Sequence, residues 1–239
     1  SGHRRVPDTF YKQLKIPLPP LNIQQQIVAE CEKVDEEYST AQKTIEENKR
    51  KIEKLMSEVK GEMKRLDDIC FINQYAISPN ATPKQEFIYI DIDAVENGTG
   101  LFSLEKRILG SNAPLRARRI AKSGSTVIST VRPNLKGFIY IEKEIKYSIF
   151  STGFAILQSK NEQILLNKMI YYIFMFSENM MQQMIAAMPK GQYPSINKDD
   201  IENFMLPVPS LAEQQRIVKE IEIYEATITD AKLVLSACA

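Results

Sequence analysis

The side chains that could carry out chemistry in this chain are few and scattered. Cys31, Cys70 and Cys238 form no C-x-x-C pair, so neither a disulfide framework nor a zinc site is predicted, and such thiols are typical of a cytoplasmic protein. The only histidine, His3, lies in residues 1–3, which resemble a cloning scar. Ser–His–Asp and Cys–His catalysis therefore lack their central base, and we do not expect an autonomous hydrolase.

Two acidic patterns could hold a metal ion, but both have a plainer interpretation. Asp91 and Asp93 share one face of a predicted strand and could bind a hard cation, although the same spacing is typical of the wet face of a half-buried strand. Glu144 and Lys146 match a short E-x-K pattern of nucleases, but no acid precedes them at a strand end. Methyl-transfer, dinucleotide and phosphate-loop motifs do not occur. We expect no catalytic residues, no metal and no bound cofactor.

Basic side chains are concentrated in one part of the chain. The formal net charge is only +1, yet residues 103–146 contain ten basic and three acidic residues, a difference of +7. A basic surface attracts phosphates and releases their counterions, and arginine can also read guanine. On composition alone, DNA contact and an ordinary solvated surface are about equally supported for the arginines. The residues that we predict to contact DNA are Arg116, Arg118, Arg119, Lys122, Arg132, Asn134, Lys136, Lys190, Gln192 and Tyr193.

A repeat organises the elements that must position these side chains. Residues 16–32 (IPLPPLNIQQQIVAECE) and 206–222 (LPVPSLAEQQRIVKEIE) are identical at nine of 17 positions, at an offset of 190. In each copy a P-x-P segment is expected to be extended, because proline fixes φ and disfavours helix before it. A polar stretch then opens a long helix.

Each predicted helix has a narrow apolar seam at alternating steps of four and three, which is a heptad pattern. The alternatives are packing of both helices on the globular domain or a coiled coil, antiparallel or between molecules, and the regular heptads favour the coiled coil. Asn48 would restrict its register. The predicted interface residues are Ile27, Val34, Tyr38, Ile45, Asn48, Ile52, Leu55, Ile221, Tyr224, Ile228 and Leu235.

The residues between the two repeats predict a globular domain that mixes strands and helices. Runs rich in β-branched and aromatic residues at 87–92, 125–131, 137–141 and 148–157 predict strands. Ser159 and Glu162 match a capping box that would open a methionine-rich core helix reaching about Met188. No apolar run approaches the roughly 20 residues of a membrane span.

This layout resembles the DNA-specificity subunit of type I restriction-modification systems. The resemblance depends on the P-x-P-x-L-x-x-Q-Q-x-I-V module, present twice, and on YPSINKDDIENFMLPVPSLAEQQRIV before the second helix. It implies an α/β (α+β) target recognition domain flanked by two long heptad helices that form a coiled coil. The implied boundaries are 1–21 for the tail of an upstream domain and linker, 22–59 for the first helix, 60–205 for the recognition domain and 206–239 for the second P-x-P segment and helix.

The resemblance also implies a role without catalysis. Such a subunit reads double-stranded DNA, docks methyltransferase subunits and, through the complex, recruits the restriction subunit; S-adenosylmethionine then belongs to the methyltransferase. A typical subunit has two recognition domains and this chain has one, so we expect a half-subunit that forms a homodimer and reads one half of a split target. The alternatives are a fragment with its own nuclease or methyltransferase activity and a coiled-coil adaptor that touches no DNA.

Overall fold

The structure is a computed structural model that describes residues 8–189 and 194–238. The chain divides into two compact units, one comprising Glu47–Ala226 and the other comprising Ser1–Glu46 with Thr227–Ala239. In the part of the chain that the structure describes, no helix combines the length and apolar character needed to cross a bilayer.

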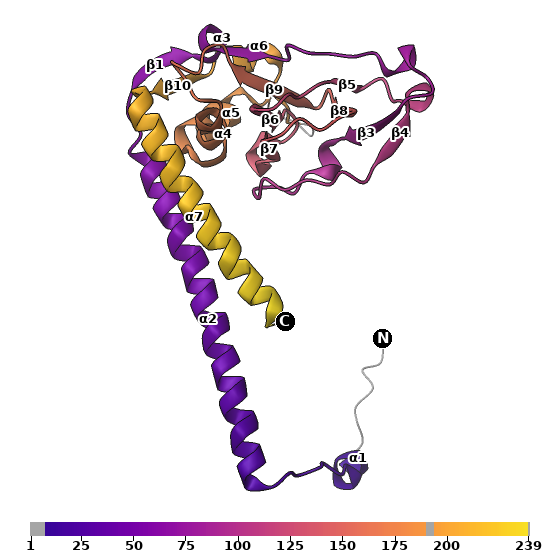
Figure 1. The fold of residues 1–239 in the computed structure, drawn as a ribbon, viewed down its shortest axis with the longest axis vertical. Coiled ribbons are helices and arrows are strands. Elements are labelled where there is room, and N and C mark those ends of the chain that lie inside the picture. Colours follow the sequence, from indigo (N-terminus) through magenta and orange to yellow (C-terminus); the bar gives the residue numbers. More distant parts are fainter. Residues whose placement is uncertain (1–7, 190–193, 239) are drawn as a thin grey trace. The chain divides into compact units, whose positions relative to one another are not determined.

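The elements follow one another as helix, mixed domain and helix (Figure 1). The α-helices are α1 (Asp8–Gln13), α2 (Leu21–Ser57), α3 (Leu66–Ile69), α4 (Asn167–Phe176), α5 (Glu178–Ala187), α6 (Lys198–Glu202) and α7 (Leu211–Ala237). The strands are β1 (Glu62–Arg65), β2 (Cys70–Ile72), β3 (Glu86–Ile90), β4 (Arg107–Leu109), β5 (Ala117–Arg119), β6 (Ser125–Ser129), β7 (Phe138–Ile141), β8 (Ser148–Ser151), β9 (Phe154–Ser159) and β10 (Met205–Val208). Short 3-10 turns span η1 (Pro79–Ala81), η2 (Ile92–Ala94), η3 (Gly110–Asn112) and η4 (Pro133–Leu135).

Two four-stranded sheets form the body of the larger unit. One has the order β2-β9-β6-β7 and is antiparallel throughout, whereas the other, β4-β3-β8-β5, contains the parallel pair β3–β8. Side chains from both sheets meet in one buried cluster, which includes Ile90 and Phe150 from the second sheet and Val127, Ile139 and Ile156 from the first. Successive residues of a strand point to opposite faces, so each sheet also has a second face to cover.

Helix α4 covers the second face of the β2-β9-β6-β7 sheet. Phe138 and Tyr140 alternate with Ile139 and point to this helix: the ring centroid of Phe138 lies 6.2 Å from that of Phe174, and the ring centroid of Tyr140 lies 5.9 Å from that of Tyr171. Because α4 is buried from Met169 to Met175, its sequence is a continuous apolar run. The core role predicted for this methionine-rich region is confirmed.

The predicted single helix from the Ser159 capping box is wrong. Ser159 and Asn161 instead accept hydrogen bonds in successive turns, and α4 begins only at Asn167. The helix also breaks at Ser177, whose hydroxyl accepts from the backbone N–H of Met180 and so caps α5.

The predicted strand at 148–157 is two strands, β8 and β9, which belong to different sheets. Thr152 and Gly153 form the turn between them. A Cβ added at Gly153 would meet Ile92 Cδ1 at 2.8 Å, so a larger residue at this corner would displace the end of that side chain. The turn lets the chain step from one sheet to the other.

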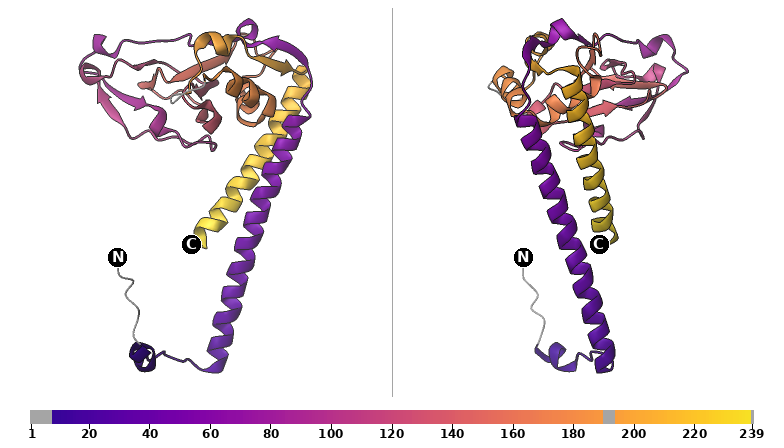
Figure 2. Two further views of the ribbon diagram at one scale, coloured as in Figure 1. Left: turned by 180° about the vertical axis from the view of Figure 1, so that it is seen from behind. Right: turned by 60° about the vertical axis from the view of Figure 1, so that its left-hand side comes forward.

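The P-x-P segment of the second repeat is β10, which is extended as predicted. It pairs with β1 from Glu62 opposite Val208 to Arg65 opposite Met205. This two-stranded ribbon lies between the end of α2 and the beginning of α7 (Figures 1 and 2).

Both predicted long helices exist, with 37 residues in α2 and 27 in α7. In the smaller unit Ala41, Ile45 and Ala231 form a buried cluster, against which Ile228 and Leu235 pack. In the larger unit Asn48, Ile52, Ile217 and Ile221 are buried, and Lys51 Nζ lies 5.6 Å from the centroid of the Tyr224 ring. Met56, at 4% exposure, is more deeply buried than the predicted seam residue Leu55.

Candidate nucleic-acid interface

Several predicted DNA-binding residues lie around the turn between β8 and β9. The N–H of Thr152 donates to the carbonyl of Arg116 at 2.8 Å, and the N–H of Thr130 donates to the carbonyl of Gly153 at 2.8 Å. The turn thus joins the residue before β5 to the residue after β6. Antiparallel pairing of β5 with β8 and of β6 with β9 brings these two strand ends to one edge of the domain.

The loop after β6 is held in an unusual backbone conformation. Arg132 and Lys136 have φ values of 46° and 56°, in the left-handed region, and flank the turn η4. This conformation costs a non-glycine residue roughly 1–2 kcal/mol, and such strain is concentrated at functional sites. Arg132 and Asn134 are not buried, so the strained loop presents a guanidinium and an amide to solvent.

A second segment supports this loop. The N–H of Arg132 donates to the carbonyl of Pro194 at 2.8 Å, and Val131 forms a β-bridge with Ser195. The predicted contact residues Lys190, Gln192 and Tyr193 lie outside the described residues. Their chain re-enters the described structure at Pro194, directly beside Arg132.

Arg116 and Arg118 point away from the domain interior. They flank Ala117, which is fully buried, and strand alternation therefore places both arginines on the opposite, outer face. The Nε–H of Arg118 donates to the carbonyl of Leu115 at 2.8 Å, which orients its guanidinium. Within the described residues, neither of these arginines nor Arg132 forms an ion pair. Their charges are available for an anionic partner.

Arg119 and Lys122 both have partners within the chain, Arg119 in the partly buried scaffold and Lys122 at the surface. The guanidinium of Arg119 donates to Asn73 Oδ1 at 2.7 Å and to the carbonyl of Phe154, and its burial lowers the pKa of Arg119. Lys122 Nζ lies 2.7 Å from Glu144 Oε1. Arg119 thus belongs to the scaffold, and Lys122 is already paired with a surface carboxylate, so both are less available than the outward-facing arginines. We therefore place the candidate interface at Arg116, Arg118, Arg132 and Asn134, with the half-buried Lys136 at its margin.

Leu135 belongs to the same surface, although sequence reasoning missed it. Its side chain is 45% exposed between Asn134 and Lys136. An apolar side chain in this position can contact a thymine methyl group. The Pro133–Asn134 turn signal could have identified the whole loop tip as exposed.

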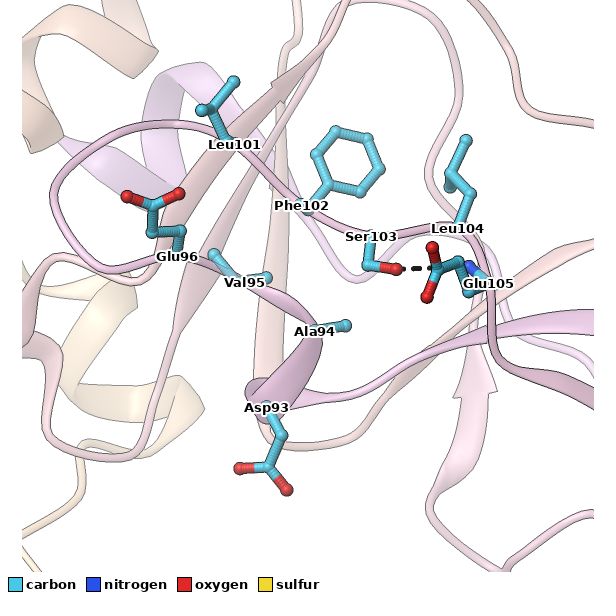
Figure 3. A pocket seen from close by; sticks show the side chains of 9 residues that line it. All are labelled: Asp93, Ala94, Val95, Glu96, Leu101, Phe102, Ser103, Leu104 and Glu105. Atoms are coloured by element: carbon cyan, nitrogen blue, oxygen red, sulfur yellow. Dashed lines mark hydrogen bonds between the residues drawn. The ribbon is translucent and has the colours of Figure 1, made fainter. Parts of the chain in front are cut away.

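The predicted position of Asp91 and Asp93 on one strand face is wrong. Strand β3 ends at Ile90, and Asp93 lies in the turn η2. The Asp91 carboxylate pairs with Lys106 Nζ, and Asp93 instead lines a shallow pocket with residues 94–96 and 101–105 (Figure 3). Figure 3 shows the two carboxylates of Glu96 and Glu105 well apart on this loop, where the N–H of Glu105 donates to Ser103 Oγ at 3.2 Å.

No cluster of metal-ligating residues was found in the described ranges, 8–189 and 194–238. Burial raises the pKa of the Cys70 thiol to about 12, which makes this cysteine a poor nucleophile. Around the β8–β9 turn the described residues thus form a cationic surface with hydrogen-bond donors.

Comparisons with known proteins point to one kind of protein. Residues 58–234 match the family model "Type I restriction modification DNA specificity domain". The chain is 24% identical over 106 residues to the type I restriction enzyme HindI specificity subunit of Haemophilus influenzae, covering 44% of this chain and 23% of that subunit.

Solved structures show the same similarity. The HsdS subunit from Thermoanaerobacter tengcongensis matches with a TM-score of 0.61 and 31% identity, over 68% of this chain and 41% of that one. The S subunit of a type I restriction-modification system from M. genitalium matches in fold with a TM-score of 0.57 and 17% identity, over 98% of this chain and 62% of that one. The chain spans less than two thirds of the length of each of these relatives. Because the family model covers well over half of the chain, this protein belongs to the family of type I restriction-modification DNA specificity domains.

Proposed function

We propose that this chain is the DNA-reading and scaffolding part of a type I restriction-modification complex in the cytoplasm. The observation that supports this proposal most is the gathering of Arg116, Arg118 and the Arg132 loop at one edge of a domain whose family is a DNA specificity domain. Arginine can grip phosphate through paired hydrogen bonds and can also read guanine in the major groove.

The geometry supports different roles for the two parts of this surface. Arg116, directly before β5, and Arg118, on the outer face of β5, would bind phosphate and fix the position of the domain. The strained loop with Arg132, Asn134 and Leu135 projects further polar and apolar groups and would enter a groove. One such domain would read one half of a split target.

The two long helices would act as a spacer. We propose that α2 and α7 pair as an antiparallel coiled coil, which is supported by the contacts of Ala41 and Ile45 with Ala231 and by the proximity of Lys51 to Tyr224. Residues later in α2 contact residues earlier in α7, which is the order expected for antiparallel helices. Their exposed charged faces would dock methyltransferase subunits, and the assembled complex would recruit the restriction subunit.

In this proposal the chain contributes no catalysis of its own. S-adenosylmethionine would be held by the methyltransferase. A homodimer would supply the second recognition domain, and it is supported by the exposed seam residues Ile27, Val34 and Tyr38, at 50%, 38% and 41% exposure.

The experiment is salt-dependent DNA binding by the chain assembled with its methyltransferase. Removing one cation that neutralises a phosphate should lower the slope of log affinity against log salt by about 0.9. Changing Arg116, Arg118 and Arg132 together to alanine should therefore reduce the slope by up to about 3 and weaken binding to every sequence. Asn134→Ala should instead relax the preference at particular base positions.

The control replaces Lys84 and Lys143, two exposed lysines away from this edge, with alanine. The proposal predicts that this variant keeps most of the salt slope. An unchanged slope in the arginine variant, or the same reduction in both variants, would show that DNA binds elsewhere.

A further inference from the structure

A leucine stands at the tip of a turn within the candidate interface. Among the described residues of the larger unit, Leu115 is the most exposed large apolar side chain, at 77%. The N–H of Ala117 donates to the carbonyl of Pro114 at 2.9 Å, which closes a β-turn with Leu115 and Arg116 at its two central positions. The turn thus presents an apolar side chain to water rather than to the core.

Two alanines fix the base of this turn. Ala113, the C-cap residue of η3, packs against a buried cluster that contains Ala117 and Ile149. Only residues 114–116 lie between the two alanines, and the ring of Pro114 restricts its own φ. A turn that is held at both ends cannot withdraw its tip without breaking these contacts. The position of Leu115 is therefore set by the scaffold of the domain.

Hydrogen bonds to the backbone fix the tip further and place cations beside it. The Nε–H of Arg118 donates to the carbonyl of Leu115 at 2.8 Å, so this guanidinium lies next to the leucine backbone. The N–H of Thr152 donates to the carbonyl of Arg116, the residue that follows the leucine, at 2.8 Å. Both arginines are exposed. The apolar tip is thus flanked by two positive charges.

This combination indicates the chemistry of the partner. A single exposed leucine is common on protein surfaces, but here it is held rigidly and accompanied by cations on the same edge as Arg132. A protein partner would have to supply acidic groups against all three arginines and an apolar pocket between them. Duplex DNA supplies phosphates along its whole length and apolar stacked bases between them. DNA-binding proteins frequently insert leucine or a similar side chain between two base pairs.

We propose that Leu115 inserts between the base pairs of one step of the target and partly unstacks them, while Arg116 and Arg118 hold nearby phosphates. The cost of unstacking depends on sequence, and pyrimidine–purine steps such as TA and CA open most easily. Leu115 therefore selects a flexible step at one position of the target without a hydrogen bond to any base. The inference rests on the proposed function, because it assumes that DNA binds at this edge, and it adds a specificity-determining residue.

The first test selects duplexes from a random-sequence pool with the chain assembled with its methyltransferase. The parent should enrich TA or CA at one dinucleotide position, and Leu115→Ala should lower this enrichment by about fivefold or more. Leu115→Phe keeps a large apolar tip and should retain the preference. Asn134→Ala should relax the preference at a different position. A parent without a step preference, or an unchanged preference in the Leu115→Ala variant, would overturn the proposal.

The second test detects unstacking with 2-aminopurine, an adenine analogue whose fluorescence rises when it leaves the base stack. The analogue replaces each adenine in turn in a duplex that the parent has selected, and every protein is added at a saturating concentration. Because methyltransferases extrude their target base, the measured quantity is the difference between parent and variant at each position. The parent should give a several-fold rise at the selected step, which Leu115→Ala loses and Leu115→Phe keeps.

The matched control is Leu109→Ala, which removes another exposed leucine from the same sheet. Leu109 is 47% exposed and lies opposite Glu86 at the beginning of β3. Because β3 and β8 are parallel and Ala117 lies opposite Ser151 at the end of β8, Leu109 is at the other end of the sheet from the Leu115 turn. Its replacement should change neither the step preference nor the fluorescence. Equal effects of the Leu109→Ala and Leu115→Ala variants would contradict the insertion of Leu115.

The salt dependence of binding separates this inference from the function on which it rests. Leu115 carries no charge, so Leu115→Ala should leave the slope of log affinity against log salt unchanged. A parent slope that depends on the three arginines, without a fluorescence difference at any position, would overturn the insertion of Leu115 alone. An arginine variant with an unchanged slope would overturn DNA reading at this edge. Loss of the methyltransferase from the Leu115→Ala complex in sedimentation would show that the leucine contacts protein instead.

Discussion

Asn73 shows how a single amide can hold three strands together. It follows β2 with a φ of 57°, in the left-handed region that asparagine tolerates better than most residues. Its Oδ1 accepts from the Arg119 guanidinium at 2.7 Å and from the N–H of Ile156 at 3.0 Å. We predict that Asn73→Ala lowers the free energy of unfolding by about 2–4 kcal/mol. The change removes the acceptor of the Arg119 guanidinium and of the Ile156 N–H, and it places alanine in the left-handed region of backbone conformation.

Denaturant unfolding measures this destabilisation, and Asn134→Ala is its matched control. Asn134 is exposed at the tip of the η4 loop, so its replacement should change stability by less than about 0.5 kcal/mol. The expected pattern is a separation of roles, with stability reduced at Asn73 and DNA preference reduced at Asn134. Equal effects of the two variants on stability would contradict the assignment of Arg119 to the scaffold.

Glu225 makes stability depend on pH. Burial raises its pKa, although the hydrogen bond from the Tyr172 hydroxyl, at 2.8 Å, and the charge of Lys168 partly oppose this. A carboxyl whose folded pKa lies above its unfolded value binds more protons when folded, so its contribution to stability is lost as pH rises through the folded pKa. The negative charges of nearby Glu222 and Glu142 also raise the pKa of Glu225.

As pH rises from the ordinary range of glutamate pKa values to neutrality, the melting temperature of the parent chain should fall. We predict that Glu225→Gln reduces this fall. The amide oxygen can still accept from Tyr172, so the change removes the charge and keeps the contact. The neighbour Glu222, changed to glutamine, should leave most of the slope in place. A steeper slope in the Glu225→Gln variant would mean that another group causes the pH dependence.

Among the elements, the ribbon of β1 and β10 is the most constrained. A Cβ added at Gly61 would lie 2.3 Å from the carbonyl carbon of Val208 and 2.5 Å from the nitrogen of Pro209. These are backbone atoms, so the clash cannot be relieved by a side-chain rotation. We predict that Gly61→Ala weakens the junction between β10 and α7 and lowers the free energy of unfolding by about 3 kcal/mol.

Gly98 provides the comparison for this variant. It has a φ of 73°, but a Cβ there would meet nothing within 4 Å. Gly98→Ala should therefore cost only the left-handed strain, about 1–2 kcal/mol. The rate of amide hydrogen exchange at Leu206 and Val208 should rise in the Gly61→Ala variant alone. A rise in both the Gly61→Ala and the Gly98→Ala variants would mean that the whole domain is loosened.

Sequence patterns predicted those elements whose burial is local. The runs that became β3, β6 and β7 are apolar because both of their faces are covered, and the long helices have a regular seam. The turn at Thr152–Gly153 was missed because a glycine inside an apolar run resembles a bulge, and only pairing with two different sheets reveals a corner. Strands β2, β4 and β5 have three residues each, and distant partners define them.

The candidate interface was predictable in composition but not in detail. Arg118 and Arg119 are adjacent and look alike in the sequence. Arg119 faces Asn73 and Phe154, which lie 46 and 35 residues away along the chain, whereas Arg118 faces solvent. Which arginine belongs to the scaffold depends on these long-range contacts, and no local pattern encodes them.

At the scale of the whole molecule, the helix α2 carries an apolar stripe that residues 8–189 and 194–238 leave exposed. Ala41 and Ile45 are buried against α7 residues, but Val34 and Tyr38, which continue the same seam, are 38% and 41% exposed. A heptad stripe of this kind stabilises a helix when another helix covers it. We predict that the chain self-associates at tens of micromolar through this stripe.

Changing Val34 and Tyr38 to glutamate should weaken self-association at least tenfold, because charge placed in a helix seam must be desolvated on pairing. Sedimentation equilibrium at several concentrations measures this change. The control, Gln42→Glu with Ser39→Glu, adds the same charge to exposed positions beside the seam and should leave association nearly unchanged. A parent chain that stays monomeric at these concentrations, or equal weakening by both variants, would mean that the stripe of α2 is not the surface through which two recognition domains are brought together.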